Sequence, residues 1–170
     1  MRGHFLVFCC AVSTLAAQPT RARVGLPGFQ DQFPIEDVAL SFTLDAPVDR
    51  SYAAVKAAFA DLKVPVDVDD SVGGVVGKQR STAQINFVGY RMSRVFNCGM
   101  STMGQNADSF RLTIVFLALL DPVDASHTKL RVGFVAGAEP VSGPRGNAVQ
   151  CGSTGVIEAK LVELASNRLK

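Results

Sequence analysis

The stretch Phe110-Arg-Leu-Thr-Ile-Val-Phe-Leu-Ala-Leu-Leu120 is the most apolar strand-like run in the sequence. All of its even-numbered positions are apolar, and the odd-numbered positions from 115 to 119 are apolar as well. Because successive side chains of a strand point to opposite faces of a sheet, this pattern predicts a central strand that is covered on both sides.

Two cysteines, Cys98 and Cys151, flank this strand and lie 53 positions apart. Cys98 follows a long strand-like run over residues 85–96, and Cys151 precedes the last predicted helix. We predict a disulfide that ties the sheet to that helix, and a closed loop of this length is worth roughly 4 kcal/mol of stability. The alternative is a pair of buried, unbonded thiols.

Residues 1–17 have the layout of a secretory signal peptide, with a basic start, a short apolar core over residues 5–11 and a small-residue end at Ala17. We expect cleavage after Ala17 and export to the periplasm or out of the cell. The alternative is a lipoprotein that is lipidated at Cys9 or Cys10. These cysteines lie very close to the start of the chain, which argues against this alternative. No later segment is long and apolar enough to predict a transmembrane helix.

After removal of residues 1–17, 153 residues remain, a length that fits one domain. The removed segment contains Arg2 and no acidic residue, so the formal net charge falls from +2 to +1. Nucleic acid is therefore an unlikely partner, since its binding depends on clustered cations. Because Cys9 and Cys10 leave with the signal peptide, an even pair of cysteines remains in an oxidising compartment.

The remaining chain divides into a leader and one domain. Residues 18–36 contain three prolines and no hydrophobic period, so we expect an extended leader. The domain covers residues 38–170 and begins with a strand at 38–44 and an amphipathic helix at 48–63. The further predicted elements are strands at 64–68, 75–78, 85–96, 110–120 and 129–138, and a helix at 154–169.

This order of elements, a strand, a helix, a run of strands and a last helix, predicts an α+β fold. Hairpin-length connections make the strands antiparallel, and both helices need an apolar surface on which to bury their stripes. We therefore expect a two-layer sandwich, in which a curved antiparallel sheet of four to six strands carries two helices and one disulfide.

The sequence offers few groups for catalysis. His127 is the one histidine after residue 17, and it lies in a predicted turn beside Ser126, where a solvated role is typical. A hydrolase would need His127 to face Ser126 or a carboxylate in a cleft. The stretch Gly-Ser-Thr-Gly at 152–155 lacks the G-x-S-x-G pattern, and its hydroxyl groups are better explained as helix caps. We predict that the protein is not an enzyme and has no cofactor.

Three aspartates, Asp67, Asp69 and Asp70, resemble metal ligands at first sight. Gly73 and Gly74 follow directly, and the spacing lacks the glycine and the distal glutamate of a calcium loop. We interpret the cluster as an acidic turn between short strands and predict no metal site.

The motif Cys151-Gly-Ser-Thr-Gly-Val-Ile-Glu158, together with Asn97-Cys98-Gly99, is similar to a family of uncharacterised secreted bacterial proteins. The order of elements over residues 38–169 resembles helix-grip domains, in which a curved sheet wraps a C-terminal helix. It also resembles the repeated domain of the BamC outer-membrane assembly lipoproteins. The resemblance implies a fold and no functional residues, and the missing lipobox argues against a membrane-anchored assembly role.

Two functions fit these observations. The first is a non-catalytic exported interaction domain with an unknown protein partner. The alternative is a carrier that holds a small apolar ligand between the sheet and the C-terminal helix, as helix-grip folds can. The side chain of Arg94 either reaches solvent along its apolar stem or meets an acid or an anion in a cleft. The residues that line such a cavity, or pack as core instead, are Phe87, Tyr90, Met92, Phe116 and Phe134.

Overall fold

The structure is a computed structural model, and it describes residues 22–102, 104–141 and 148–170. The predicted signal peptide, its cleavage site and residues 18–21 of the expected leader lie outside the described residues. No helix within the described ranges is long and apolar enough to cross a lipid bilayer.

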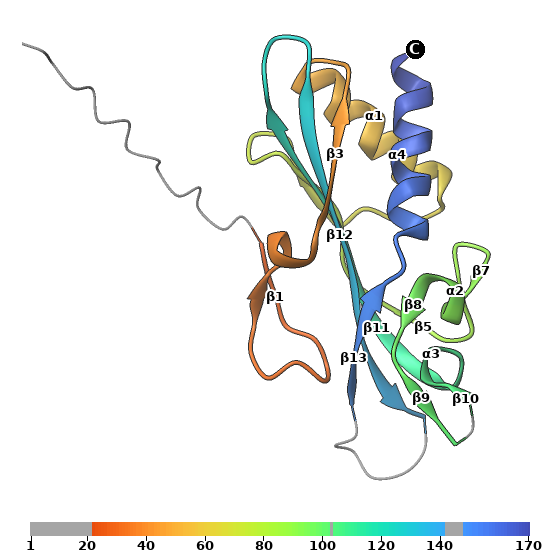
Figure 1. The fold of residues 1–170 in the computed structure, drawn as a ribbon. Helices are drawn as coiled ribbons and strands as arrows, with labels where there is room; N and C mark the ends of the chain where they lie inside the picture. The colour runs from red at the N-terminus through yellow and green to blue at the C-terminus, as the bar shows by residue number, and fades with distance from the viewer. Residues whose placement is uncertain (1–21, 103, 142–147) are drawn as a thin grey trace, which may run out of the picture.

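The chain folds as an α+β sandwich on one antiparallel sheet of seven strands (Figure 1). Six strands follow the order β4-β5-β11-β12-β13-β8, and the seventh, β3, pairs with β12. The predicted fold class is confirmed, although the sheet has seven strands instead of four to six. The strands are β3 Leu40–Leu44, β4 Val68–Asp70, β5 Val75–Ala83, β8 Phe96–Asn97, β11 Phe110–Pro122, β12 Thr128–Pro140 and β13 Val149–Ser153.

The centre of the sheet is the β11–β12 hairpin, paired without a break from Phe110 opposite Pro140 to Pro122 opposite Thr128. β11 also pairs with β5, and its residues from Ile114 to Leu120 are all buried. The prediction of a central strand covered on both sides is thereby confirmed. The second edge of β12 is shared, since β3 pairs with the half near the hairpin turn and β13 with the other half.

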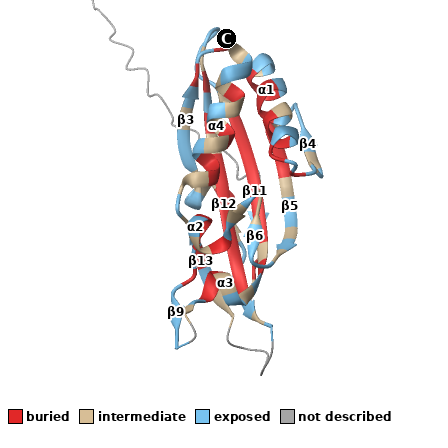
Figure 2. Cartoon of the chain, turned by 90° about the vertical axis from the view of Figure 1, so that its right-hand side faces the viewer, coloured by how far each residue is buried: buried red, intermediate tan, exposed pale blue. Residues whose placement is uncertain are grey.

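Helices α1, Val48–Asp61, and α4, Val156–Leu169, pack against each other on one face of the sheet (Figures 1 and 2). The apolar stripe predicted for α1 is buried under this layer, as expected from its spacing of three and four residues. An ion pair joins the ends of the two helices, with Arg168 Nη2 2.7 Å from Asp61 Oδ1 and Arg168 Nε 3.0 Å from Asp61 Oδ2.

The core between helices and sheet is filled by aromatic rings. The ring centroids of Phe96 and Phe134 lie 4.4 Å apart, those of Phe59 and Phe116 4.7 Å, and those of Phe116 and Phe134 4.9 Å. Two one-turn helices, α2 Met92–Val95 and α3 Asn106–Ser109, cover the other end of this face (Figure 2).

The opposite face of the sheet is covered by the N-terminal segment, residues 22–38. It consists of the hairpin β1 Arg23–Val24 and β2 Phe33–Pro34 and the short helix η1 Ile35–Val38. The buried side chains of Val24, Leu26 and Ile35 pack with the outer apolar side chains of β11. In place of the extended leader expected for residues 18–36, residues 22–36 thus belong to the domain, because the second apolar face of β11 needs a cover.

The long strand predicted over residues 85–96 is wrong. The chain forms a small hairpin there, β6 Asn86–Phe87 and β7 Tyr90–Arg91, before α2 and β8. Val88 and Gly89 have positive φ angles of 43° and 83°, and such a two-residue turn reverses the chain. A second hairpin, β9 Met100–Ser101 and β10 Gly104–Gln105, occupies the region expected as a loop.

Candidate functional site

A cleft of about 520 Å³ opens between the C-terminal end of α1 and the β6–β7 hairpin. This volume lies within the range of small-molecule sites. β5 contributes Lys78 and Ser81 to the lining. The full set of lining residues is Asp61, Leu62, Lys63, Val64, Pro65, Lys78, Ser81, Asn86, Phe87, Val88 and Gly89.

One wall of the cleft is the end of α1, which closes as a Schellman motif. The Lys63 N–H donates to the Ala60 carbonyl at 2.9 Å, and the Val64 N–H donates to the Phe59 carbonyl at 3.0 Å. This motif needs a left-handed residue after the helix, a place usually taken by glycine. Here Lys63 occupies it, with φ 58°, so the helix end carries backbone strain.

The opposite wall contains two further strained residues. Val88 has φ 43° in the hairpin turn, and Ile85, just before β6, has φ 73°. Positive φ is a genuine outlier for β-branched residues. Lys63, Ile85 and Val88 are the non-glycine residues with positive φ in the described ranges, and they line the cleft or adjoin its wall. Clustered strain of this kind is typical of ligand clamps and active sites.

The charges around the cleft leave one cation without an acidic partner. Lys78 Nζ lies 2.9 Å from Asp67 Oδ2, and Asp61 is held by Arg168. Burial acts to raise the pKa of Asp67, but hydrogen bonds from Lys78 and from the Gln79 N–H outweigh it and hold the pKa below its usual range. Within the described part of the chain, exposed Lys63 makes no ion pair.

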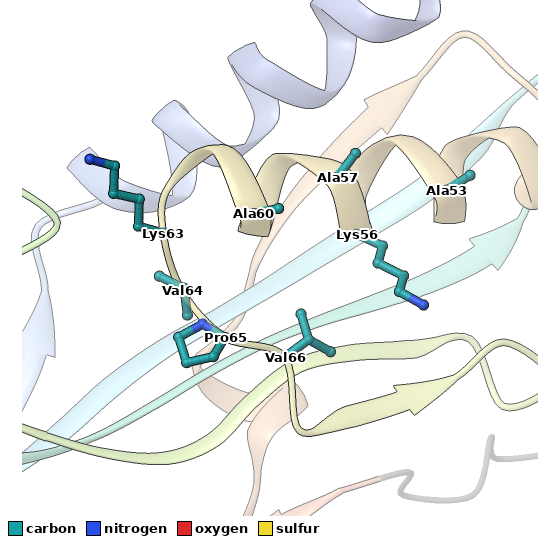
Figure 3. Close-up of a pocket in the computed structure, with 8 residues that line it drawn as sticks. All are labelled: Ala53, Lys56, Ala57, Ala60, Lys63, Val64, Pro65 and Val66. Atoms are coloured by element: carbon teal, nitrogen blue, oxygen red, sulfur yellow. The ribbon is translucent and has the colours of Figure 1, made fainter.

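A second, open groove of about 710 Å³ runs along the outer side of α1 and shares Lys63, Val64 and Pro65 with the cleft. Figure 3 shows its alanine residues along α1 and Val64, Pro65 and Val66 on the extended segment that follows. Its other lysine, Lys56, lies 2.6 Å from Asp69 Oδ2. The groove therefore extends the apolar surface of the cleft beyond Pro65 without adding an unpaired charge.

The five residues predicted to line a cavity do not share one cavity. Met92, Phe116 and Phe134 are fully buried in the aromatic core. Half-buried Phe87 lines the cleft, and its ring also contacts Phe134 at a centroid distance of 5.4 Å. Tyr90 is half-buried and packs against the core, while Arg94 is exposed.

The sequence interpretation missed Lys63, and a signal for it exists. The predicted helix ends before Pro65, and no glycine stands between its last apolar residue and that proline. Helices commonly end in a left-handed residue, and because no glycine is present here, Lys63 adopts that conformation.

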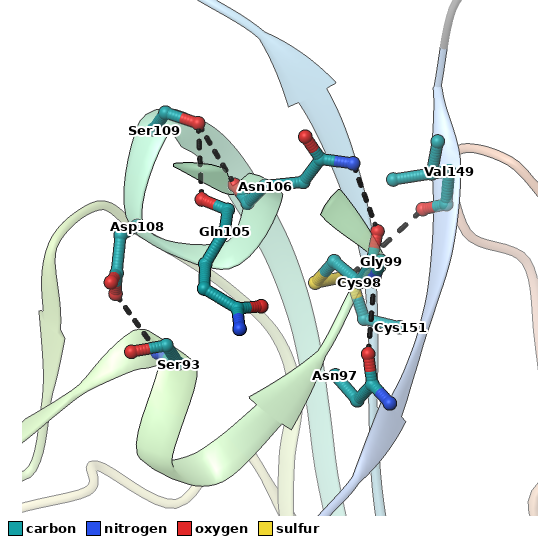
Figure 4. Close-up of a disulfide and its surroundings, with 10 residues drawn as sticks. All are labelled: Ser93, Asn97, Cys98, Gly99, Gln105, Asn106, Asp108, Ser109, Val149 and Cys151. Atoms are coloured by element: carbon teal, nitrogen blue, oxygen red, sulfur yellow. Dashed lines mark hydrogen bonds between the residues drawn. A yellow bond between two sulfur atoms is a disulfide. The ribbon is translucent and has the colours of Figure 1, made fainter. Parts of the chain in front are cut away.

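The predicted disulfide between Cys98 and Cys151 is confirmed, with their Cα atoms 4.2 Å apart (Figure 4). Both residues are buried. The Asn106 side-chain amide donates to the Cys98 carbonyl at 3.1 Å, and the Gly99 N–H donates to Asn97 Oδ1 at 3.1 Å. The disulfide and these hydrogen bonds therefore hold this part of the fold together.

His127, Ser126 and Asp124 lie together in the exposed β11–β12 turn. The same nitrogen, His127 Nδ1, lies 3.1 Å from Ser126 Oγ and 2.8 Å from Asp124 Oδ2. A catalytic triad needs two different ring nitrogens, one for the nucleophile and one for the acid. Hydrogen bonds, first from the Ser126 backbone N–H and then from the His127 and Ser126 side chains, lower the pKa of Asp124 to about 2. Asp124, Ser126 and His127 therefore form a hydrogen-bonded turn.

The three clustered aspartates are engaged separately. Asp67 pairs with Lys78, Asp69 accepts hydrogen bonds from Tyr52 and Lys56, and Asp70 accepts one from the Gly73 N–H at 2.8 Å. In the described ranges, no three His, Cys, Asp or Glu side chains gather as a set that could hold a metal ion.

Comparison with known proteins found no matching family model, no matching curated protein and no matching solved structure.

Proposed function

We propose that this chain is a non-catalytic, exported binding domain that holds a small amphiphilic anion in the cleft between α1 and the β6–β7 hairpin. The observation that carries the proposal is the gathering of strained residues around one cleft whose uncompensated charge is Lys63. Export is supported by the buried disulfide, because such bonds persist in oxidising compartments.

The strain at Lys63 supports a role for its side chain. Glycine adopts a positive φ at no steric cost, whereas a residue with a β-carbon pays about 1 kcal/mol or more. A lysine at this position therefore costs stability, and its exposed side chain, which makes no ion pair within the described residues, lies beside a cleft of mixed apolar and polar lining. An anion bound in the cleft would form an ion pair with the ammonium group of Lys63.

The lining defines the chemical class of the ligand. Val64, Pro65, Phe87 and Val88 offer apolar contacts, while Ser81 and Asn86 offer hydrogen bonds. A ligand with an aromatic or aliphatic body and one carboxylate or sulfonate group matches this combination. The groove that continues past Pro65 provides apolar surface for a longer tail.

This location differs from the cavity between sheet and C-terminal helix in which the alternative function drawn from the sequence placed a ligand. The side chains between those layers, such as Phe116, Phe134, Ile157 and Leu161, are fully buried against one another. The carrier function is thus proposed for the cleft at the end of α1.

A pair of fluorescent probes tests the proposal. Anilinonaphthalene sulfonate carries an anionic group on an apolar body, and phenylnaphthylamine is its uncharged parent. We expect both to bind the folded protein, and Lys63→Gln to weaken the charged probe about fivefold, as for an exposed ion pair worth about 1 kcal/mol. The uncharged probe should bind both proteins equally. Lys129→Gln, which removes an exposed lysine from β12, is the matched control.

A blocking variant locates the probes. Asn86→Trp introduces a large side chain at an exposed lining position and should abolish binding of both probes while the melting temperature stays high. Undiminished binding by this variant would contradict the cleft as the site. Equal binding of the charged probe by wild type and Lys63→Gln would contradict the anionic part of the ligand.

A further inference from the structure

β3 is an edge strand with one side open. Its residues Leu40–Leu44 pair with Val132–Thr128 of β12. No described residue pairs with its other side, and Figure 2 shows β3 at one edge of the sheet and β4 at the other. A strand in this position presents a row of outward N–H and C=O groups, which template pairing with another strand.

The sequence of this edge lacks the usual protection against pairing. Residues 38–44, Val-Ala-Leu-Ser-Phe-Thr-Leu, contain no charge, no proline and no glycine. Val38 and Leu40 are 40% and 43% exposed, although they are apolar. Segments of this composition tend to pair with strands of other chains when they are exposed at the edge of a sheet.

The opposite edge is protected. β4 ends in Asp69 and Asp70, and Asp69 is engaged by Lys56 from α1. Charged side chains on an edge strand prevent sheet-to-sheet association. The two edges of the same sheet thus differ in the feature that decides whether a second strand can add.

We propose that β3 pairs with β3 of a second copy of this chain, antiparallel and centred on Phe42, so that the two sheets become one. In this register, Leu40 lies opposite Leu44 of the other copy and Ser41 lies opposite its Thr43. Apolar pairs then continue the helix-covered face, because Leu40, Phe42 and Leu44 are in register with Val132, Leu130 and Thr128 of β12. Cross-strand pairs of matching character stabilise a sheet.

The flanking charges favour this arrangement over a parallel one. In the antiparallel register, Asp45, which directly follows β3, falls opposite Ala39, and Asp37 lies outside the paired residues because it belongs to η1, so no like charges meet. A parallel pair in register would set Asp45 against Asp45 of the other copy, which is destabilising. The edge is thus complementary to itself in the antiparallel sense.

Charge variants on the outer side chains test the pairing. Ser41→Glu with Thr43→Glu places glutamates opposite one another across the proposed dimer. Within one copy these positions face Arg131 and Lys129 of β12, so the double variant should keep its fold. Sedimentation velocity from low to several hundred micromolar should show a monomer–dimer equilibrium for wild type and a monomer for the double glutamate variant.

A mixing experiment completes the test. The variant with Thr43→Lys and Lys129→Glu keeps opposite charges on the paired positions 43 and 129 and should form a one-to-one heterodimer with the double glutamate variant. Val123→Lys, a charge at an exposed apolar position in the β11–β12 turn, should leave the wild-type dimer intact. A wild type that stays monomeric throughout, or a folded double glutamate variant that still dimerises, would overturn the proposal.

Discussion

Gly133 of β12 lies directly beneath Ile35 of η1, so that a β-carbon at position 133 would overlap Ile35 Cγ1 and Cδ1. Four residues along the same strand, a β-carbon on Gly137 would overlap the Pro27 backbone. Because these two glycines have no side chain, the N-terminal segment can cross the sheet in close contact with β12. Buried Ile35 belongs to the apolar core between the N-terminal segment and the sheet.

Gly133→Ala should destabilise the protein by about 1–3 kcal/mol, because the added methyl group overpacks a closed contact. Urea unfolding measures the change. Gly152→Ala is the matched control, since a β-carbon there meets no atom within 4 Å. Equal stability of the two variants would mean that the N-terminal segment does not pack on β12 as described.

Lys63→Gly should raise the free energy of unfolding by about 1 kcal/mol, because glycine relieves the positive φ at the end of α1. Lys63→Gln keeps the strain and should leave stability unchanged. Both variants should weaken the charged probe. Chemical denaturation of the three proteins thus separates the strain from the charge, and a destabilised glycine variant would show that the backbone at 63 is not strained.

Replacement of both disulfide cysteines, Cys98→Ser with Cys151→Ser, should cost roughly 4 kcal/mol for the loop that the bond closes. For a chain of this size, the melting temperature should fall by about 10 °C. Removing both thiols avoids a free cysteine that could form mixed disulfides. An unchanged melting temperature would refute the stabilising role of the bond.

Glu158 is 1% exposed in the first turn of α4, and burial raises its pKa, although a hydrogen bond with Ser153 acts in the opposite direction. The folded state therefore binds a proton that the unfolded state releases as the pH rises. The stability that this proton contributes is complete below about pH 4 and is lost as the pH rises through the raised pKa.

Glu158→Gln mimics the protonated group, so the melting temperature of this variant should exceed that of wild type increasingly as the pH rises from about 4 through the raised pKa. Glu163→Gln, on the exposed side of the same helix, is the control and should show no such trend. A constant difference between Glu158→Gln and wild type would contradict the raised pKa.

Local pattern predicted the two long helices and the central strands, but it placed β4 too early and did not predict β13. The stripe of α1 and the double-sided apolar pattern of β11 follow from single-strand and single-helix periodicity, and both are buried as expected. The pattern failed over residues 85–96, where alternation suggested one strand. There, Val88 adopts a left-handed conformation that its side chain disfavours, and only contacts made by the folded chain can impose it.

The sequence by itself determined the α+β class, the central strand and the pairing of Cys98 with Cys151, because periodicity and an even cysteine pair are local or countable features. The tertiary structure alone decided that residues 22–38 cover the second face, that Lys63 lies at a cleft, and that β3 has one unpaired side among the described residues. These features depend on which distant segments meet. The spacing of apolar residues along the chain does not show which distant segment will strain, cover or expose a given residue.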